Sequence, residues 1–218
     1  MRVAITGGGT GGHLAIAAAL LEALKQKGHE AIYIGSVSGQ DRGWFGEETR
    51  FEKRFFLDTS GVVNRRYLGK LWALWKIFRA VLKSRRILKE EKIDAVVSVG
   101  GFSAAAATFG AYTKHIPFFI HEQNAVMGRL NAMMKPYASA FYSSYDEKSP
   151  VRDYPVRDLF FDTAHLRKEI KTVIFLGGSQ GAKFICQVLH DSCRGNPVAD
   201  ASQGTFQIQR VHGLEPWG

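Results

Sequence analysis

The sequence predicts an α/β fold with a doubly wound parallel sheet, and two observations support this prediction. Short apolar runs alternate with helical stretches over the first 145 residues, the pattern of a parallel sheet covered by helices on both faces. Glycine or polar clusters directly follow three of these runs, at residues 7–13, 100–103 and 121–124. Because such sheets bind ligands at the carboxyl ends of their strands, we expect the three clusters to converge on one cleft.

The individual elements follow from local composition. Residues 3–6 (Val-Ala-Ile-Thr) and 31–34 (Ala-Ile-Tyr-Ile) are short apolar runs of the kind found in buried parallel strands. Further strands are predicted at residues 54–57, 95–99, 118–121 and 139–142. The alanine- and leucine-rich stretch 13–27 predicts the first helix, and further helices are predicted at residues 44–49, 68–90, 103–113 and 127–137.

The first cluster reads Gly7-Gly8-Gly9-Thr10-Gly11-Gly12-His13 and joins the first strand to the first helix. Such a junction directs backbone N–H groups and the positive helix end toward one point, which suits a phosphate or diphosphate. The glycines also fit a dinucleotide fingerprint, but Gly35-Ser36 follow the second strand where that fingerprint needs a carboxylate. The simpler alternative is a tight turn with His13 merely near the helix cap.

Composition places the chain among soluble globular proteins. Its 218 residues are 45% hydrophobic and 22% charged, and its two cysteines, Cys186 and Cys193, indicate neither a zinc site nor a disulfide framework. We expect a reducing compartment, no signal peptide, no membrane-spanning helix and neither a metal nor a cofactor. The net charge of +9 is concentrated between residues 62 and 92, where ten basic and two acidic residues occur.

The basic segment coincides with the predicted helix 68–90. Apolar residues at helical spacing are most simply explained as core packing: Leu71, Leu74, Trp75, Phe78, Val81 and Leu82. The other flank places a tryptophan among cations: Trp72, Lys76, Arg79, Lys83 and Arg86. A tryptophan among cations suits an anionic membrane surface, with the ring at the level of the headgroups. Nucleic acid is the rival partner, and we do not expect it because the helix lacks a recognised nucleic-acid motif.

The later part of the chain predicts a second, incomplete domain. Residues 146–170 are polar in their first part, contain prolines and indicate a linker after a first domain at 1–145. At 171–182 the pattern of a strand followed by a glycine loop occurs again, and this second loop reads Gly177-Gly178-Ser179-Gln180-Gly181-Ala182. Beyond Ile185 the apolar periodicity fades, so we expect residues 171–218 to form only the start of a domain with a poorly packed tail.

Taken in order, the glycine loop ending in His13, Gly100-Gly101, the run His121 to Asn124, Pro155-Val156-Arg157 and the loop 177–182 resemble the MurG family. These bacterial glycosyltransferases of family 28 transfer N-acetylglucosamine (GlcNAc) to lipid I, forming lipid II. The resemblance covers about residues 1–185. It implies the Rossmann-like N-terminal half of a GT-B fold, acting at the cytoplasmic face of the bacterial inner membrane. The divergence after Ile185 indicates a truncated or altered donor domain.

The resemblance implies roles for particular residues. It places the donor UDP-GlcNAc against Thr10, Gly11, Gly12, Asn124, Arg157 and Ser179. The diphosphate-binding loops would contain Gly9, Gly100, Gly101, Gly178, Gln180 and Gly181. The acceptor would be lipid I, undecaprenyl-pyrophosphoryl-MurNAc-pentapeptide. Asp153-Tyr154 stand where the family usually has Gly-Asn before Pro-Val-Arg, so the expectation for Arg157 rests on a partial match.

Glycosyl transfer requires a base for the acceptor hydroxyl, and two residues compete for that role. His13 is the first candidate, because the pKa of histidine lies near working pH; orientation of the substrates is its alternative role. Glu122 is the second, although a carboxylate at a strand end is more often a structural hydrogen-bond acceptor. Asn124 can donate and accept toward a sugar or diphosphate, and Arg157 suits a phosphate, with an exposed linker arginine as the alternative.

Two other functions remain open from the sequence. One is a non-catalytic module that presents the acceptor at the membrane and needs a separate donor subunit. The other is an NAD(P)-dependent oxidoreductase, which the missing carboxylate after Ile34 disfavours. For the isolated chain we expect weak transferase activity or none, because most of the donor-binding surface is missing.

Overall fold

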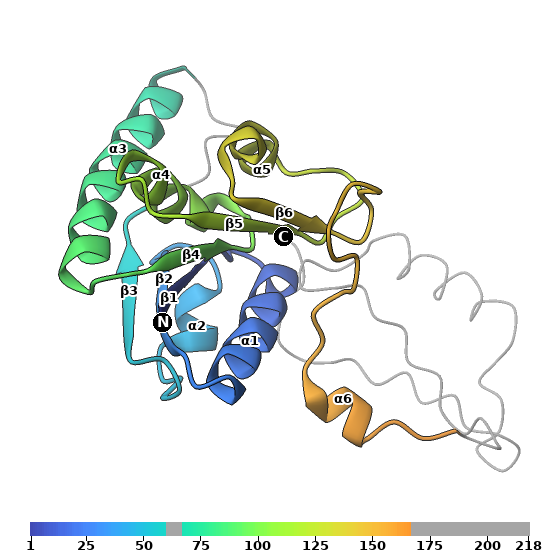
Figure 1. The fold of residues 1–218 in the computed structure, drawn as a ribbon. Coiled ribbons are helices and arrows are strands. Elements are labelled where there is room, and N and C mark those ends of the chain that lie inside the picture. Colours follow the sequence, from blue (N-terminus) through green and yellow to red (C-terminus); the bar gives the residue numbers. More distant parts are fainter. Residues whose placement is uncertain (60–66, 167–218) are drawn as a thin grey trace, which may run out of the picture. The chain divides into compact units, whose positions relative to one another are not determined.

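The structure, a computed structural model, describes residues 1–59 and 67–166. The chain divides into two units, Met1–Phe161 and Asp162–Gly218, and little of the second is described. The second glycine loop, with Gly178, Ser179, Gln180 and Gly181, therefore lies outside the described residues. The first unit contains the whole sheet (Figure 1).

The predicted sheet is confirmed. Its six parallel strands have the order β3-β2-β1-β4-β5-β6. Their bounds are β1 Arg2–Thr6, β2 Glu30–Ser36, β3 Lys53–Leu57, β4 Ala95–Ser98, β5 Phe118–Glu122 and β6 Ala140–Ser143. The strand order reverses between β1 and β4, which is the position where doubly wound sheets open a crevice for ligands.

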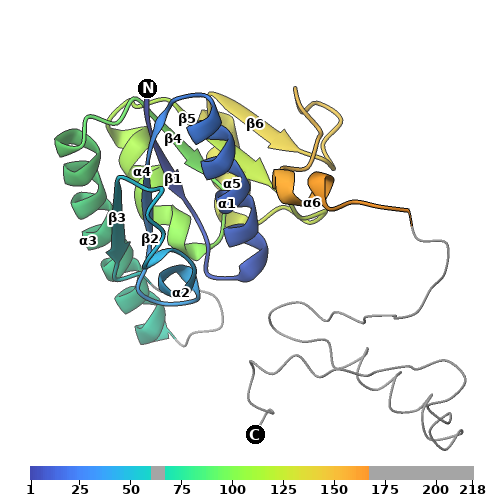
Figure 2. The same cartoon turned by 90° about the horizontal axis from the view of Figure 1, so that it is seen from below.

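Helices cover both faces of the sheet, as the alternating pattern predicts. They are α1 Gly11–Gln26, α2 Asp41–Phe45, α3 Tyr67–Glu90, α4 Ala105–Thr113, α5 Arg129–Met134 and α6 Asp158–Asp162. Short 3-10 turns at Phe102–Ala104 and Lys135–Tyr137 extend two of them. Figures 1 and 2 show α3, α4 and α5 on one side of the sheet and α1 and α2 on the other. The helix expected at 44–49 begins earlier, at Asp41.

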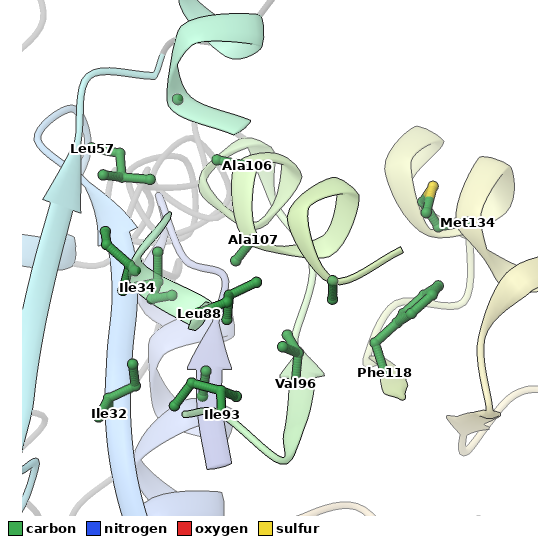
Figure 3. Packing of buried hydrophobic residues seen from close by; sticks show 14 of the residues in the cluster. Ile32, Ile34, Leu57, Leu88, Ile93, Val96, Ala106, Ala107, Phe118 and Met134 are labelled. Atoms are coloured by element: carbon green, nitrogen blue, oxygen red, sulfur yellow. The ribbon is translucent and has the colours of Figure 1, made fainter. Parts of the chain in front are cut away.

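Two apolar clusters form the core, one on each face. On the α3–α4 face, Ile32, Ile34 and Val96 pack with Leu88 and Ala107 (Figure 3). On the other face, Ile5, Leu14 and Tyr33 are fully buried in the cluster that includes α1. Residues 31–34 are therefore buried on both faces, which explains why their sequence is continuously apolar rather than alternating.

The expected core stripe of α3 is wrong in part. Trp75, Phe78 and Leu82 are 46%, 59% and 48% exposed. The residues by which α3 enters the core are small or lie near its end: Ala80, Ser84, Ile87 and Leu88. Small residues allow close approach to α4, where the side-chain oxygen of Ser84 would lie only 2.9 Å from a Cβ at Gly110. Trp75, Phe78 and Leu82 are consequently left on its outer surface, whereas the side chains of Leu71 and Leu74 lie outside the part of the chain that the structure describes.

The pairing register of the strands determines where the candidate site lies. Thr6 at the end of β1 is level with Ile34 on β2 and Ser98 on β4. The loops that follow these strands therefore leave the same edge of the sheet. Because Ser98 also pairs with Ile120 on β5, the loop after β5 emerges beside them. The carboxyl edge thus collects the three sequence clusters and the loop after β2.

Candidate functional site

The two glycine clusters pack directly against each other. The N–H of Gly8 donates to the carbonyl of Gly100 at 3.1 Å. A Cβ at Gly7 would lie 2.5 Å from that same carbonyl oxygen, so the β1 and β4 loops approach more closely than a side chain permits. At Gly9, a φ of +84° adds a conformation that favours glycine. The glycines are thus required to bring the ends of β1 and β4 together.

The N-terminus of α1 faces outward from this contact. Thr10 is its N-cap residue in an extended conformation, and its side chain makes no capping hydrogen bond. Gly12 is exposed, and a Cβ there would meet nothing within 4 Å. Uncapped first-turn N–H groups and the positive end of the helix dipole favour an anion at this place.

His13 lies in the first turn of α1 and is half-buried. Its Nδ1 is 2.8 Å from Oγ1 of Thr10. Burial lowers the pKa of His13 below 6.5, and the negative charges of Glu122 and Asp41 partly oppose that shift. The imidazole is therefore neutral at neutral pH, the state in which a ring nitrogen can accept a proton.

Glu122 at the end of β5 is buried and fully bonded. Its Oε1 accepts the backbone N–H and the side-chain N–H of Asn124, each at 2.9 Å. Its Oε2 accepts the N–H of Gly128 at 2.8 Å and Nδ2 of Asn131 at 2.9 Å. Four donors occupy the lone pairs that a base would use, so the geometry favours the structural interpretation of Glu122.

A chain of contacts joins the three clusters, as expected. Nδ2 of the buried Asn131 would lie 2.9 Å from a Cβ at Gly100, and the ring of His13 would lie 3.5 Å from the same point. Asn131 is bonded to Glu122, which holds the exposed Asn124. Beside Asn124 a hollow of about 390 Å3 is lined by Met127, Phe141, Tyr145 and Lys148, among others.

Two residues of the expected diphosphate-binding loops use their backbone N–H groups within the protein. The N–H of Gly9 donates to the buried carboxylate of Asp41 at 2.6 Å. The N–H of Gly100 lies 3.4 Å from the hydroxyl of Ser98. Asp41 was missed because it lies after the β2 loop, beyond the place where a dinucleotide fingerprint puts its carboxylate.

Arg157 is not near the glycine loop. Its Nε lies 3.2 Å from Oε2 of Glu22, and the N–H of Asp158 donates to the other oxygen of that carboxylate. Figure 2 shows α6 beside α1. Glu22 is nine residues after His13 on one helix, about 13 Å along its axis. In this conformation the linker arginine anchors α6 to α1.

The outer surface of α3 carries the expected basic flank. Trp72, Arg79, Lys83 and Arg86 are exposed, whereas Lys76 is half-buried and bonds to Asp58 at 3.0 Å. The rings of Trp72 and Trp75 stack at 5.0 Å, and the guanidinium of Arg79 lies 4.8 Å from the ring centre of Trp75. Aromatic and cationic side chains are thus mixed on a single exposed face, together with Phe78 and Leu82.

Among the described residues, His, Cys, Asp and Glu side chains do not gather into a group of three that could hold a metal ion. Within the same part of the chain, no helix combines the length and apolarity needed to cross a bilayer. The fold and the paired glycine loops define a class of domains: doubly wound sheets that bind phosphate-bearing ligands at a helix N-terminus.

Comparison with known proteins identifies the family. Residues 3–143 match the N-terminal domain of glycosyltransferase family 28, and the chain belongs to that family. A protein of Sulfurimonas denitrificans named UDP-N-acetylglucosamine–N-acetylmuramyl-(pentapeptide) pyrophosphoryl-undecaprenol N-acetylglucosamine transferase is 62% identical over 185 residues, 85% of this chain and 54% of that protein. A protein of the same name from Wolinella succinogenes is 55% identical, over 85% of this chain and 55% of its own length.

The fold agrees with this family. The crystal structure of Acinetobacter baumannii MurG has a TM-score of 0.66 and 27% sequence identity, and covers 90% of this chain and 58% of the other. The chain spans about half the length of the curated relatives that it matches. The 185 residues aligned with the Sulfurimonas denitrificans protein agree with the expected extent of the resemblance.

Proposed function

We propose that this chain forms the acceptor-binding half of a transferase that moves GlcNAc from UDP-GlcNAc to lipid I in peptidoglycan synthesis. The names of its relatives and its membership of glycosyltransferase family 28 support the reaction. The structural observation that carries the proposal is the uncapped N-terminus of α1, with Thr10 bonded to His13 beside the paired glycine loops.

The chemistry follows from these groups. The hydroxyl oxygen of the acceptor sugar attacks the anomeric carbon of GlcNAc, and the bond from that carbon to the diphosphate oxygen of UDP breaks. UDP leaves with the bonding electron pair, and the first-turn N–H groups at Gly11 and Gly12 stabilise negative charge on the diphosphate. The hydroxyl proton passes to Nε2 of His13, in the tautomer whose Nδ1–H donates to Oγ1 of Thr10.

Asn124 is proposed as a sugar or diphosphate contact. Its side chain is exposed while one N–H is held by Glu122, which fixes the amide in one orientation. Held this way, the remaining amide groups can bond to a ligand without first losing rotational freedom. Glu122 is then a positioning group, and His13 is the remaining candidate base of the two named from the sequence.

The exposed face of α3 is proposed as a peripheral contact with the cytoplasmic side of the inner membrane. Its aromatic rings suit the headgroup level, and the cations Arg79, Lys83 and Arg86 suit anionic lipids. The lipid-linked acceptor gives this contact a purpose, because its polyprenyl chain stays in the bilayer.

The experiment combines ligand binding and turnover. The purified chain is titrated with inorganic pyrophosphate, and GlcNAc transfer to lipid I is assayed after the C-terminal half of the Sulfurimonas denitrificans relative is added in trans. We expect pyrophosphate binding that shifts the amide resonances of Gly11 to His13, and transfer only in the mixture. Absence of either result contradicts the proposal. Transfer that is lost with His13→Ala but retained with the surface variant His29→Ala assigns the activity to this site.

A further inference from the structure

A carboxylate lies buried beneath the glycine loop. Asp41, the first residue of α2, has 0% of its surface exposed. One oxygen accepts the N–H of Gly9 at 2.6 Å. The other lies 3.0 Å from the N–H of Ser36 and 3.1 Å from the hydroxyl of Tyr33. A single side chain therefore ties the loop after β1 to the end of β2. Its buried charge is compensated by the two backbone N–H groups, and by the hydroxyl of Tyr33, whose single proton is shared with the carbonyl of Gly7 at 2.8 Å.

The surrounding glycines leave room for this carboxylate. A Cβ at Gly8 would lie 2.8 Å from both oxygens of Asp41, and a Cβ at Gly35 would lie 2.7 Å from one of them. Both distances are shorter than a carbon–oxygen contact allows. Glycine at these two positions therefore leaves room for the carboxylate of Asp41 on the protein side. The absence of a Cβ also lets a ligand approach the loop from the solvent side.

The backbone N–H groups of the loop after β1 and of the start of α1 fall into two groups. The N–H of Gly8 donates to Gly100 and the N–H of Gly9 donates to Asp41, so both are used inside the protein. The first-turn N–H groups of α1 follow directly and are not capped by Thr10. The N–H groups of Gly8 and Gly9 are therefore used in hydrogen bonds within the protein, whereas the first-turn N–H groups of α1 remain for an anion.

We propose that Asp41 is a positioning residue that fixes the Gly8–Gly9 backbone so that the first turn of α1 and His13 meet a diphosphate in one orientation. This inference rests on the proposed function, which supplies the diphosphate. Without the carboxylate, the half-buried Gly9 N–H would lose its acceptor, and the peptide would turn to find another. Such a turn would rotate the start of α1. The negative charge of Asp41 also acts on His13, where it opposes the effect of burial on the pKa.

The test compares variants with inorganic pyrophosphate as the probe. Asp41→Asn keeps the shape of the side chain but replaces one acceptor oxygen by an amide that donates, so it cannot accept from both backbone N–H groups. Gly35→Ala keeps the carboxylate but crowds both it and the ring of Tyr33, from which the new Cβ would lie 2.5 Å. Ile93→Ala is the matched control, because Ile93 is a buried core residue two positions before β4, at the amino ends of the strands and so away from the glycine loops. We expect Asp41→Asn and Gly35→Ala to weaken binding about tenfold, and Ile93→Ala to lower Tm without changing binding.

The outcomes separate this inference from the proposed function. Unchanged pyrophosphate affinity in Asp41→Asn or in Gly35→Ala overturns the positioning role. A wild-type chain that does not bind pyrophosphate contradicts the proposed function instead. In that case the titration of His13, followed by NMR, decides the role of Asp41. We expect Asp41→Asn to lower the pKa of His13 and to move the amide resonances of Gly11 and Gly12. An unchanged pKa and unchanged resonances reject the inference.

Discussion

Oγ1 of Thr10 lies 2.8 Å from Nδ1 of His13, so the residue that begins α1 bonds to a ring three positions further along. A threonine at this position normally caps the helix by accepting a backbone N–H. Here its hydroxyl is used to orient an imidazole instead. When Nδ1–H donates to the hydroxyl, Nε2 carries the free lone pair that a base requires. The pair therefore leaves the helix end open and, in this tautomer, orients the proposed base.

The first prediction concerns this pair. Thr10→Val removes the hydroxyl at nearly constant volume and should reduce transfer in the trans-complemented assay about tenfold, because the ring loses its orientation. Thr10→Ser keeps the hydroxyl and should retain most of the rate, which makes it the matched control. His13→Ala should cost roughly a hundredfold or more. Equal rates for Thr10→Val and Thr10→Ser would show that the hydrogen bond has no part in transfer.

The second prediction is the pH dependence of transfer. Burial lowers the pKa of His13 below 6.5, against the opposing charges of Glu122 and Asp41. A base acts in its neutral form, so kcat should be constant above pH 6.5 and should fall as pH drops through the lowered pKa. Adding Asp41→Asn removes one of the opposing charges and should move this acid limb to still lower pH. A limb that moves upward contradicts the assignment of His13 as base.

The third prediction concerns stability in mild acid. His121 is 5% exposed on β5, with Tyr154 edge-on at 6.1 Å, and burial lowers its pKa below 6.5. The unfolded chain then binds a proton more readily than the folded chain. The contribution of His121 to stability is thus present above pH 6.5 and is lost as pH falls through its lowered pKa. His121→Gln should flatten the loss of unfolding free energy just below pH 6.5 in urea titrations.

Glu48 provides an internal control for that measurement. Its hydrogen bond with Arg50 lowers its pKa from 4.5 to about 2. A carboxylate with a lowered pKa stabilises the fold above pH 4.5, and this contribution is lost between about pH 4.5 and 2. Glu48→Gln should therefore change only the more acidic part of the curve. A change in unfolding free energy near pH 6 in Glu48→Gln would show that the pH ranges of His121 and Glu48 cannot be separated.

The fourth prediction tests Glu122 as a structural group. Glu122→Gln replaces one carboxylate oxygen by an amide donor, which then faces the N–H groups of Asn124, or those of Gly128 and Asn131. An unpaired buried donor costs about 1–3 kcal/mol, so we expect a loss of that size in unfolding free energy. Glu147→Gln, on the exposed rim of the neighbouring hollow, should leave stability unchanged. A fully stable Glu122→Gln variant with a lost rate would restore Glu122 as a candidate base.

The sheet and the meeting of the three clusters were predictable because they depend on local signals. Apolar runs such as residues 31–34 define buried strands, and a glycine cluster after a strand marks a ligand-binding turn. Parallel connection then brings the strand ends to one edge. The family resemblance added the expected roles of His13 and Asn124. In the structure these two residues are linked by contacts through Gly100, Asn131 and Glu122.

Other features depend on tertiary contacts that periodicity does not encode. Helical spacing placed Trp75 and Phe78 in the core, but α3 packs through Ala80 and Ser84 because α4 approaches closely at Gly110. Asp41 has no sequence signal of its own, since its partners lie in the loop after β1 and on β2, outside its own helix. Arg157 lies at α1 because it bonds to Glu22, a partner 135 residues earlier in the chain.

The last prediction concerns the membrane and follows from that exposed face of α3. Arg79 and Lys83 are exposed, and each cation near an anionic bilayer contributes about 1 kcal/mol to binding. The double change Arg79→Gln and Lys83→Gln should therefore lower binding to anionic vesicles about 30-fold at low salt, and less as salt screens the charges.

Two further variants separate charge from apolar burial on this face. Lys76→Gln is the matched control, because Lys76 is half-buried and paired with Asp58, and it should change binding little. Trp72→Ala should weaken binding in a way that depends less on salt, since the ring acts by burial of apolar surface. Vesicle sedimentation with anionic and neutral lipids measures each case. If the double variant and Trp72→Ala both bind as the wild type does, α3 is not the membrane contact, and its exposed aromatic residues serve another surface.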